Sequence, residues 1–230
     1  MEEFPSYFAY VSKQDLCVLC PAPPAFINCM LETQCRHVLT IEDPIEFIFE
    51  HSENSIIHQR EVKRDTNSFS TALRAALRED PDVIYIGEMR DLETIQLAIT
   101  AAETGHLVLG TLHTSSASKT VERIVDVFPA DQQEQARLQV STSLAGIMSQ
   151  TLCKNTKGKR SLAYELMVNT PAIGNLIREK KVSEIYSQLQ TGSQLGMNTL
   201  EQCLNQLYSN GLITQEEALG KASNKKAIKF

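Results

Sequence analysis

One β-α-β pattern in the middle of the sequence constrains the fold more than any other feature. The apolar run at residues 83 to 86 is typical of a buried parallel strand, and a second apolar strand is expected at residues 107 to 112 after an intervening helix. Glu88 follows the first strand and His113 follows the second. Because ligand crevices of open α/β sheets lie at the carboxyl ends of the strands, the pattern predicts that this acid and this histidine share one site.

Strands and helices also alternate on the amino-terminal side of this pattern. We expect a helix at 25–33, strands at 38–41 and 55–59, a helix at 68–78 and a helix from Asp91 to Gly105. This alternation favours a three-layer α/β core with a mostly parallel sheet. After Lys119 helices are expected to dominate, apart from one strand at 162–168.

The last third of the sequence therefore predicts a mostly helical region. Four apolar residues recur at helical spacing: Leu144, Ile147, Met148 and Leu152. This spacing indicates a helix that faces the core. A capping box at 199–202 and Gly211 bound another expected helix, and Thr214 begins one more. The basic tail at 221–229 is expected to be a frayed, solvated end.

Composition excludes several classes of protein. A hydrophobic content of 42% and a charged content of 22% are typical of a folded globular chain, so a disordered protein is excluded. The net charge of −6 argues against a nucleic-acid-binding surface. The acidic start has no basic targeting region, and the apolar stretch at 16–27 is too short to span a bilayer. We expect a cytoplasmic protein that is not integral to a membrane.

Cysteines concentrate near the start of the chain. Four of the six lie within the first 35 residues: Cys17, Cys20, Cys29 and Cys35. The Cys-x-x-Cys pair at 17 and 20 is compatible with zinc or redox chemistry, but the other two cysteines do not form the second close pair that a structural zinc site usually has. We therefore favour ordinary thiols over a metal site.

No phosphate-binding loop of the Gly-x-x-x-x-Gly-Lys-Ser/Thr type occurs in the sequence. There is no glycine before Gly87, and the Gly-Lys pairs at 158–159 and 220–221 lack both the earlier glycine and a preceding apolar strand. The glycines of such a loop are needed because consecutive backbone N–H groups must turn inward around phosphate with no Cβ in the way.

Three carboxylates are crowded into five positions of the phrase TIEDPIEF. They are Glu42, Asp43 and Glu46. A nucleotide with Mg²⁺ would neutralise them, and one of them could position or deprotonate an attacking water. The alternative is a solvated acidic loop.

Histidines and arginines near these motifs are further candidates. His106 and His113 flank the strand at 107–112, although each alone is more often a structural histidine. Five arginines could bind phosphate or act across a subunit interface: Arg60, Arg64, Arg74, Arg78 and Arg90. For any one of them a surface ion pair is favoured.

Three ordered motifs together resemble those of the type IV pilus retraction ATPases, the twitching-motility motors of the secretion-ATPase superfamily. TIEDPIEF at 40–47 is similar to the Asp box of that family, DPDVIYIGEMRD at 80–91 to its Walker B motif, and TGHLVLGTLHT at 104–114 to its His box. The resemblance extends from about residue 25 to residue 222. It implies a RecA-like core, ATP and Mg²⁺ as ligands, and a hexameric ring that meets a platform protein of the inner membrane from the cytoplasmic side.

The resemblance also implies roles for individual residues. Glu46 would be the catalytic acid that orients water, and Glu88 would hold Mg²⁺ through a water molecule as a second catalytic carboxylate. Glu42 and Asp43 would contribute to cofactor binding. His106 and His113 would sense the state of the nucleotide. The phrase at 171–179 is similar to a retraction-specific helix of the family, with Gly174 where the family usually has arginine.

These observations divide the chain into an atypical segment at 1–24, an ATPase core without a phosphate loop at 25–154, and a helical region at 155–230. Residues 13–19 occupy the register where the loop of the family should be, so we expect segment 1–24 to be poorly packed and to result from a truncated or frame-damaged coding sequence. Two functions are compatible with this: a motor ATPase, or a non-hydrolysing remnant of one. Extension ATPases usually carry a four-cysteine zinc insertion, which Cys153 and Cys203 cannot supply.

Overall fold

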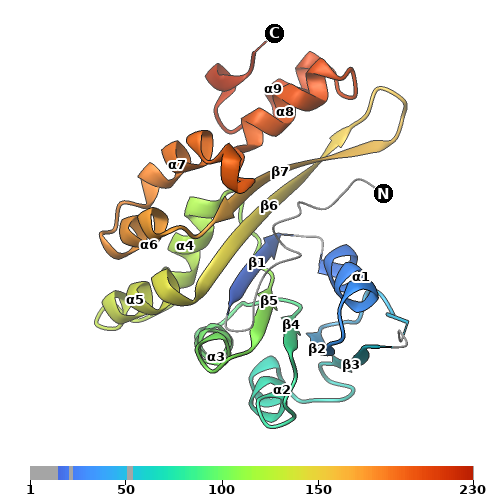
Figure 1. Ribbon diagram of the computed structural model, residues 1–230, viewed down its shortest axis with the longest axis vertical. Coiled ribbons are helices and arrows are strands. Elements are labelled where there is room, and N and C mark those ends of the chain that lie inside the picture. Colours follow the sequence, from blue (N-terminus) through green and yellow to red (C-terminus); the bar gives the residue numbers. More distant parts are fainter. Residues whose placement is uncertain (1–14, 21–22, 51–53, 230) are drawn as a thin grey trace.

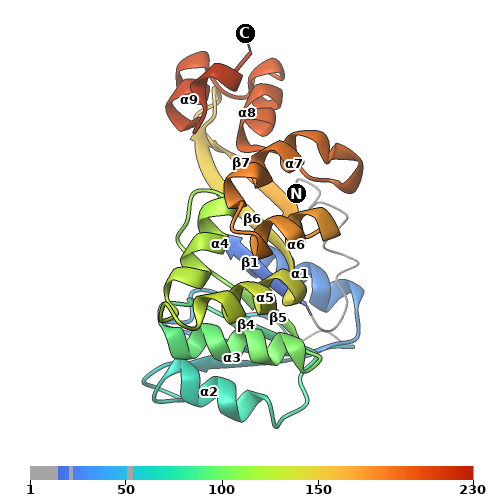
Figure 2. The same cartoon turned by 90° about the vertical axis from the view of Figure 1, so that its left-hand side faces the viewer.

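One seven-stranded sheet forms the centre of the molecule, and helices cover both of its faces (Figures 1 and 2). The computed structural model describes residues 15–20, 23–50 and 54–229. The strand order is β3-β2-β4-β5-β1-β6-β7, and all neighbours pair in parallel except β6 and β7. The strands are β1 (Leu16–Cys20), β2 (His37–Glu42), β3 (Ile56–Glu61), β4 (Val83–Ile86), β5 (Leu107–Gly110), β6 (Leu144–Lys154) and β7 (Arg160–Val168).

The helices form two layers against this sheet. They are α1 (Pro23–Thr33), α2 (Phe69–Ala76), α3 (Leu92–Glu103), α4 (Ala117–Asp126), α5 (Gln133–Ser143), α6 (Pro171–Arg178), α7 (Ile185–Thr191), α8 (Leu200–Ser209) and α9 (Gln215–Lys221). Apolar side chains of α2 to α7 pack in one core cluster, whereas those of α1 pack in a second cluster with the other face of the sheet. The predicted three-layer α/β fold is confirmed.

Side-chain caps explain where several helices begin. Asp91 accepts a hydrogen bond from the backbone N–H of Thr94 at the start of α3, and Thr214 caps α9 in the same way. The predicted capping box of α8 is present, with Thr199 and Gln202 bonded reciprocally. These caps satisfy N–H groups that have no partner within their own helix.

The prediction that residues 1–24 are poorly packed is wrong for residues 16–20. They form β1, which lies between β5 and β6 near the middle of the sheet. The side chains of Leu16, Cys17 and Val18 are at most 1% exposed. A parallel strand with both faces covered has no alternation of polar and apolar residues, so this short run gave no periodic signal. Residues 1–14 and 21–22 lie outside the described part of the chain.

The predicted helix at 144–152 is also wrong. This segment is the long strand β6, which pairs in parallel with β1 and antiparallel with β7. Ile147 reaches one core cluster and Met148 the other, because successive residues of a strand point to opposite faces. Leu144 shares the cluster of Ile147 because the pairing with β1 shifts by one residue between Leu144 and Gly146. A strand that is buried on both faces places apolar residues at helical spacing by coincidence.

The basic carboxyl-terminal tail is packed rather than frayed. Asn205 of α8 donates to the backbone oxygen of Ala227 and accepts from the N–H of Lys229, at 3.1 and 2.9 Å. Ile228 is 8% exposed and belongs to a small apolar cluster with α8, α9 and Cys153. None of the described helices combines the length and the apolar character that crossing a bilayer requires.

Candidate functional site

The ends of β2, β4 and β5 meet around a cavity of about 410 Å³. Glu42 lines it at the last position of β2 and Glu46 in the loop that follows, Glu88 lines it after β4, and His113 lines it after β5. The parallel pairing of these strands places their carboxyl ends at one edge of the sheet, as the sequence predicts. Asp43 lines the same cavity, so five of the six predicted site residues lie together.

Gly87 allows the strand ends to approach each other closely. Its N–H donates to the backbone oxygen of Ile41 at 2.7 Å. A Cβ at this position would lie 3.1 Å from that oxygen and 3.2 Å from Cα of Glu42, which is closer than side chains normally pack. Thr111 donates its hydroxyl to the backbone oxygen of Gly87 and so connects the loop after β5 to the same point. The glycine therefore brings three strand ends together.

Glu88 is the central carboxylate of the cavity. One of its oxygens pairs with Arg90, and the other lies 3.4 Å from Nε2 of His113. The hydrogen bond from Arg90, with smaller contributions from His113, holds the pKa of Glu88 below its ordinary value although partial burial opposes this. Glu88 is thus ionised near neutral pH and remains partly open to solvent. Such a carboxylate suits Mg²⁺, which prefers hard oxygen ligands and keeps several waters.

Glu42 is held differently from the other acids. Its side chain is buried and accepts hydrogen bonds from Thr40 at 2.6 Å and from Gln59 at 3.1 Å. Burial, with the charge of Glu42 as a smaller cause, raises the pKa of the neighbouring Tyr85. Glu42 is therefore a fixed acceptor at the floor of the cavity.

The acidic loop after β2 is tied to the edge strand. Gln59 of β3 donates to the backbone oxygen of Phe47 at 2.9 Å and accepts from the N–H of Phe49 at 3.0 Å. Asp43 and Glu46 are exposed, and Asp43 lies 3.8 Å from Lys63. The loop is anchored while two of its carboxylates face solvent. The sequence did not single out Gln59, since glutamine carries no motif signal.

His106 does not join this site. It precedes β5, at the end of the strand opposite to His113, and its Nδ1 lies 3.1 Å from the backbone oxygen of Ala101 and 3.3 Å from the hydroxyl of Thr104. The two histidines flank opposite ends of the same strand, so the sensing role that the motif resemblance implies for His106 stays a prediction.

Three of the five candidate arginines form surface ion pairs. Arg60 pairs with Glu79, Arg64 with Asp65 and Arg74 with Glu93, at 2.7 to 2.9 Å. Arg90 alone among the five lines the acidic cavity. It is the arginine placed to meet an anion there.

The side of the cavity that should hold phosphate has a different composition. Pro24, near the start of α1, lines the cavity. Only residues 21–22 separate β1 from α1, so the register of a phosphate loop falls there and not on residues 13–19. Pro23 and Pro24 carry no backbone N–H, and the connection contains no glycine. The residues present therefore suit Mg²⁺ but do not form a cradle for a triphosphate.

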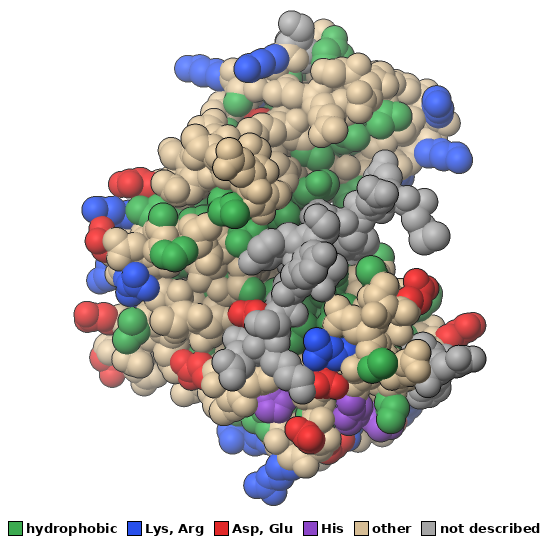
Figure 3. Space-filling model, in the orientation of Figure 1, with side chains coloured by type: hydrophobic (Ala, Val, Ile, Leu, Met, Phe, Trp, Pro, Cys, Tyr) green, Lys and Arg blue, Asp and Glu red, His purple; other side chains and the backbone are tan. Residues whose placement is uncertain are grey.

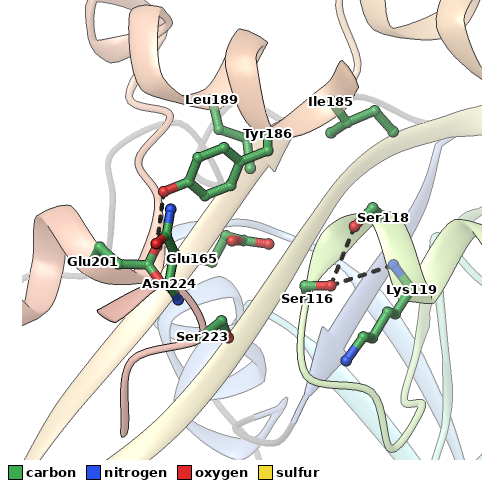
Figure 4. Close-up of a pocket in the computed structure, with 10 residues that line it drawn as sticks. All are labelled: Ser116, Ser118, Lys119, Glu165, Ile185, Tyr186, Leu189, Glu201, Ser223 and Asn224. Carbon is green, nitrogen blue, oxygen red and sulfur yellow. Dashed lines mark hydrogen bonds between the residues drawn. The ribbon is translucent and has the colours of Figure 1, made fainter. Parts of the chain in front are cut away.

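A second cavity of about 260 Å³ lies where α4, α7 and α8 approach β7 (Figure 4). Two buried carboxylates line it. Glu165 accepts from the N–H of Ala117 at 2.7 Å, and Glu201 accepts from the hydroxyl of Tyr186 at 3.2 Å and from the N–H of Asn224 at 2.8 Å. Burial is the largest cause of a raised pKa at Glu165, and the charge of Glu201 adds to it. These carboxylates join the core to the carboxyl-terminal helices.

Comparison with known proteins assigns the family. Residues 25–220 match the model of the type II/IV secretion system protein family. The chain belongs to this family. One relative is the type IV pilus retractation ATPase PilT of Pseudomonas aeruginosa, which is 58% identical to this chain over 198 residues. The matched region covers 86% of this chain and 57% of the relative. A twitching motility protein of Neisseria gonorrhoeae is 54% identical over 90% of this chain and 55% of its own length.

A solved structure gives the same result for the fold. The crystal structure of the pilus retraction motor PilT with bound ADP matches with a TM-score of 0.87 and 47% identity, covering 97% of this chain and 65% of that one. The core of the chain is thus RecA-like. The chain spans between half and two thirds of the length of the relatives named here.

Proposed function

We propose that this chain is a subunit of the ATP-dependent motor that retracts type IV pili in twitching motility. The observation that carries the proposal is the convergence of Glu42, Glu46, Glu88 and His113 on one cavity. The relatives of the chain include a type IV pilus retractation ATPase and a twitching motility protein. From the resemblance of the three motifs to the retraction ATPases, we extend the proposal to ATP and Mg²⁺ as ligands and to a hexameric ring in the cytoplasm that docks on the platform protein of the inner membrane.

The proposed roles follow from how each side chain is held. Glu88 is ionised and partly open, so it is suited to hold Mg²⁺ through a water molecule. Glu46 is exposed at the rim, where it can orient an attacking water. Asp43 and the fixed carboxylate of Glu42 complete the negative wall, and His113 can report on the charge of Glu88 through their contact. Bound Mg²⁺ would supply charge neutralisation for phosphoryl transfer.

A second candidate function is a non-hydrolysing subunit of the same ring. The specific observation that favours it is the β1–α1 connection, where Pro23 and Pro24 stand at the helix start that faces the cavity and no glycine is present. Phosphoryl transfer depends mainly on positioning and charge neutralisation by such a loop, so its loss typically costs several orders of magnitude in rate. Joining a ring does not require that chemistry. For this chain alone we therefore favour the non-hydrolysing subunit, and the first candidate describes the motor to which that subunit belongs.

Expression in a bacterium that lacks its retraction motor separates the two candidates. A hydrolysing motor restores twitching, and Glu88→Gln abolishes the restoration. A non-hydrolysing subunit fails to restore twitching but reduces it when expressed beside an intact motor, because mixed rings contain inactive sites. If neither effect occurs although the chain accumulates in folded form, membership in a retraction motor is contradicted.

A further inference from the structure

Two histidines contact each other on the outer strands of the sheet, away from the acidic cavity. Nε2 of His37, the first residue of β2, lies 3.1 Å from Nδ1 of His58 on β3. The two rings are perpendicular, with centroids 5.2 Å apart. His58 is exposed and His37 is half-buried, so solvent reaches the pair. Figure 3 shows exposed histidine side chains among acidic ones in the lower part of the drawn face.

The backbone holds both histidines in place. In the parallel register of β2 and β3, His58 lies opposite Leu39, and His37 lies two residues before Leu39 on the same face. Asp82 fixes His37 further, since its carboxylate accepts from the N–H of His37 at 2.8 Å and its own N–H donates to the backbone oxygen of His37 at 2.8 Å. The two rings are therefore presented side by side by a rigid part of the sheet.

The separation of the two nitrogens matches chelation of one metal ion. Imidazole nitrogens bind transition metals at about 2.0–2.1 Å, so two of them on one ion lie about 2.9 Å apart at a right angle and about 3.4 Å apart in a tetrahedron. The observed 3.1 Å lies between these limits. In the absence of metal the same spacing is satisfied by a hydrogen bond between the two rings. Binding a metal needs each ring to carry its proton on its other nitrogen and to turn so that both lone pairs point at the same ion.

We propose that His37 and His58 form a two-histidine site for a divalent transition metal ion. Imidazole suits nickel, copper and zinc, whereas Mg²⁺ prefers oxygen ligands, so this site is chemically distinct from the acidic cavity. In the described part of the chain, no group of three or more His, Cys, Asp or Glu side chains is placed to hold a metal. Water therefore completes the coordination. A bound ion connects the edge strand β3 to β2, whose far end carries Glu42.

Titration of the purified chain with Ni²⁺, followed by calorimetry, tests the proposal. Nickel is the chosen probe because the exposed thiol of Cys35 would compete for zinc. We expect one bound ion per chain and at least tenfold weaker binding in His58→Gln. The matched controls are His106→Gln and Cys35→Ser, which should bind as tightly as the unmodified chain.

Copper gives an independent readout of the ligands. The electron paramagnetic resonance spectrum of one equivalent of Cu²⁺ should show coupling to two imidazole nitrogens in the unmodified chain and to fewer in His58→Gln. Circular dichroism confirms that the variant is folded, which is expected because His58 is exposed. Nickel affinity that stays within about twofold in His58→Gln, or a copper spectrum unchanged by that substitution, would overturn the proposal.

Discussion

The two sides of the candidate nucleotide cavity differ in what they offer a ligand. On the acidic side, the ends of β2, β4 and β5 present carboxylates and His113. Hydrogen bonds hold Glu42, and Arg90 pairs with Glu88. On the opposite side, β1 is joined to α1 by residues 21–22, and the helix begins with two prolines. The acidic side has the carboxylates that a phosphoryl-transfer site needs. The sequence of the opposite side contains no glycine, and its prolines carry no backbone N–H.

This difference shows that the sheet does not depend on the loop. Leu16, Cys17 and Val18 of β1 are as deeply buried as the residues of β4, although the segment that follows β1 is unlike a phosphate loop. The stability of the fold comes from apolar packing, whereas binding of phosphate requires particular N–H groups. A chain can therefore keep the fold and the acidic residues while its chemistry is lost.

The largest effect is expected from changing the phosphate side. Replacing residues 21–24 by a Gly-x-x-x-x-Gly-Lys-Ser sequence should raise the steady-state ATPase rate at least about 10³-fold, because preorganised donors at a transition state are each worth about 10²–10³ in rate. The matched control is the same insertion with alanine in place of lysine, which should stay near the rate of the unmodified chain. A folded insertion variant without any gain would show that the acidic side is also incomplete.

A smaller effect is expected on stability, where substitutions in β1 and in β2 can be compared to test whether the two strands contribute equally to the core. Leu16→Ala and Leu39→Ala each remove a buried side chain, and each should lower the free energy of unfolding by about 2–5 kcal/mol in urea denaturation. Leu138→Ala is the control, since that side chain is 46% exposed and its loss should cost about 0.5 kcal/mol or less. A cost for Leu16→Ala that equals the control value would contradict the central position of β1.

The buried carboxylate of the second cavity should behave oppositely to Glu88. Burial raises the pKa of Glu165, so the protonated form is favoured in the folded state and its contribution to stability is lost as pH rises from about 4.3 through the raised value. Glu165→Gln keeps an acceptor for Ala117, and its unfolding free energy should decline less over this pH range than that of the unmodified chain. Denaturation at a series of pH values measures this, and identical slopes would refute the assignment.

The smallest effect concerns the ion pair of the acidic side. Arg90→Ala removes the main cause of the lowered pKa of Glu88, so that pKa should rise toward its ordinary value in a carboxyl-detected NMR titration. Any stability that Glu88 contributes is present above its unfolded pKa and is lost as pH falls through the lowered one. Arg74→Ala is the control, because Arg74 pairs with Glu93 on the surface instead. An unchanged pKa in Arg90→Ala would leave His113 as the main partner.

The parts of the fold that the sequence predicts correctly are those with clear local signals. The helix between β4 and β5 is bounded by clear signals at Asp91 and Gly105, and the apolar runs of β2, β4 and β5 are followed directly by the acids and His113. The strand β6 was mistaken for a helix because burial on both faces removes the alternation that identifies a strand. Hydrogen bonds of Gln59 and the contact of His37 with His58 depend on pairing between distant segments, which no local pattern reveals.

Steady-state hydrolysis of ATP by the unmodified chain tests the central claim most directly. The assay compares purified chain with Glu88→Gln in the presence of Mg²⁺, because Glu88 is the ionised carboxylate that we propose holds that ion. We predict that both rates equal the background of the buffer, since the acidic side alone does not position the phosphates. Turnover by the unmodified chain that falls in Glu88→Gln would contradict the account, because another group would then have to hold the phosphates.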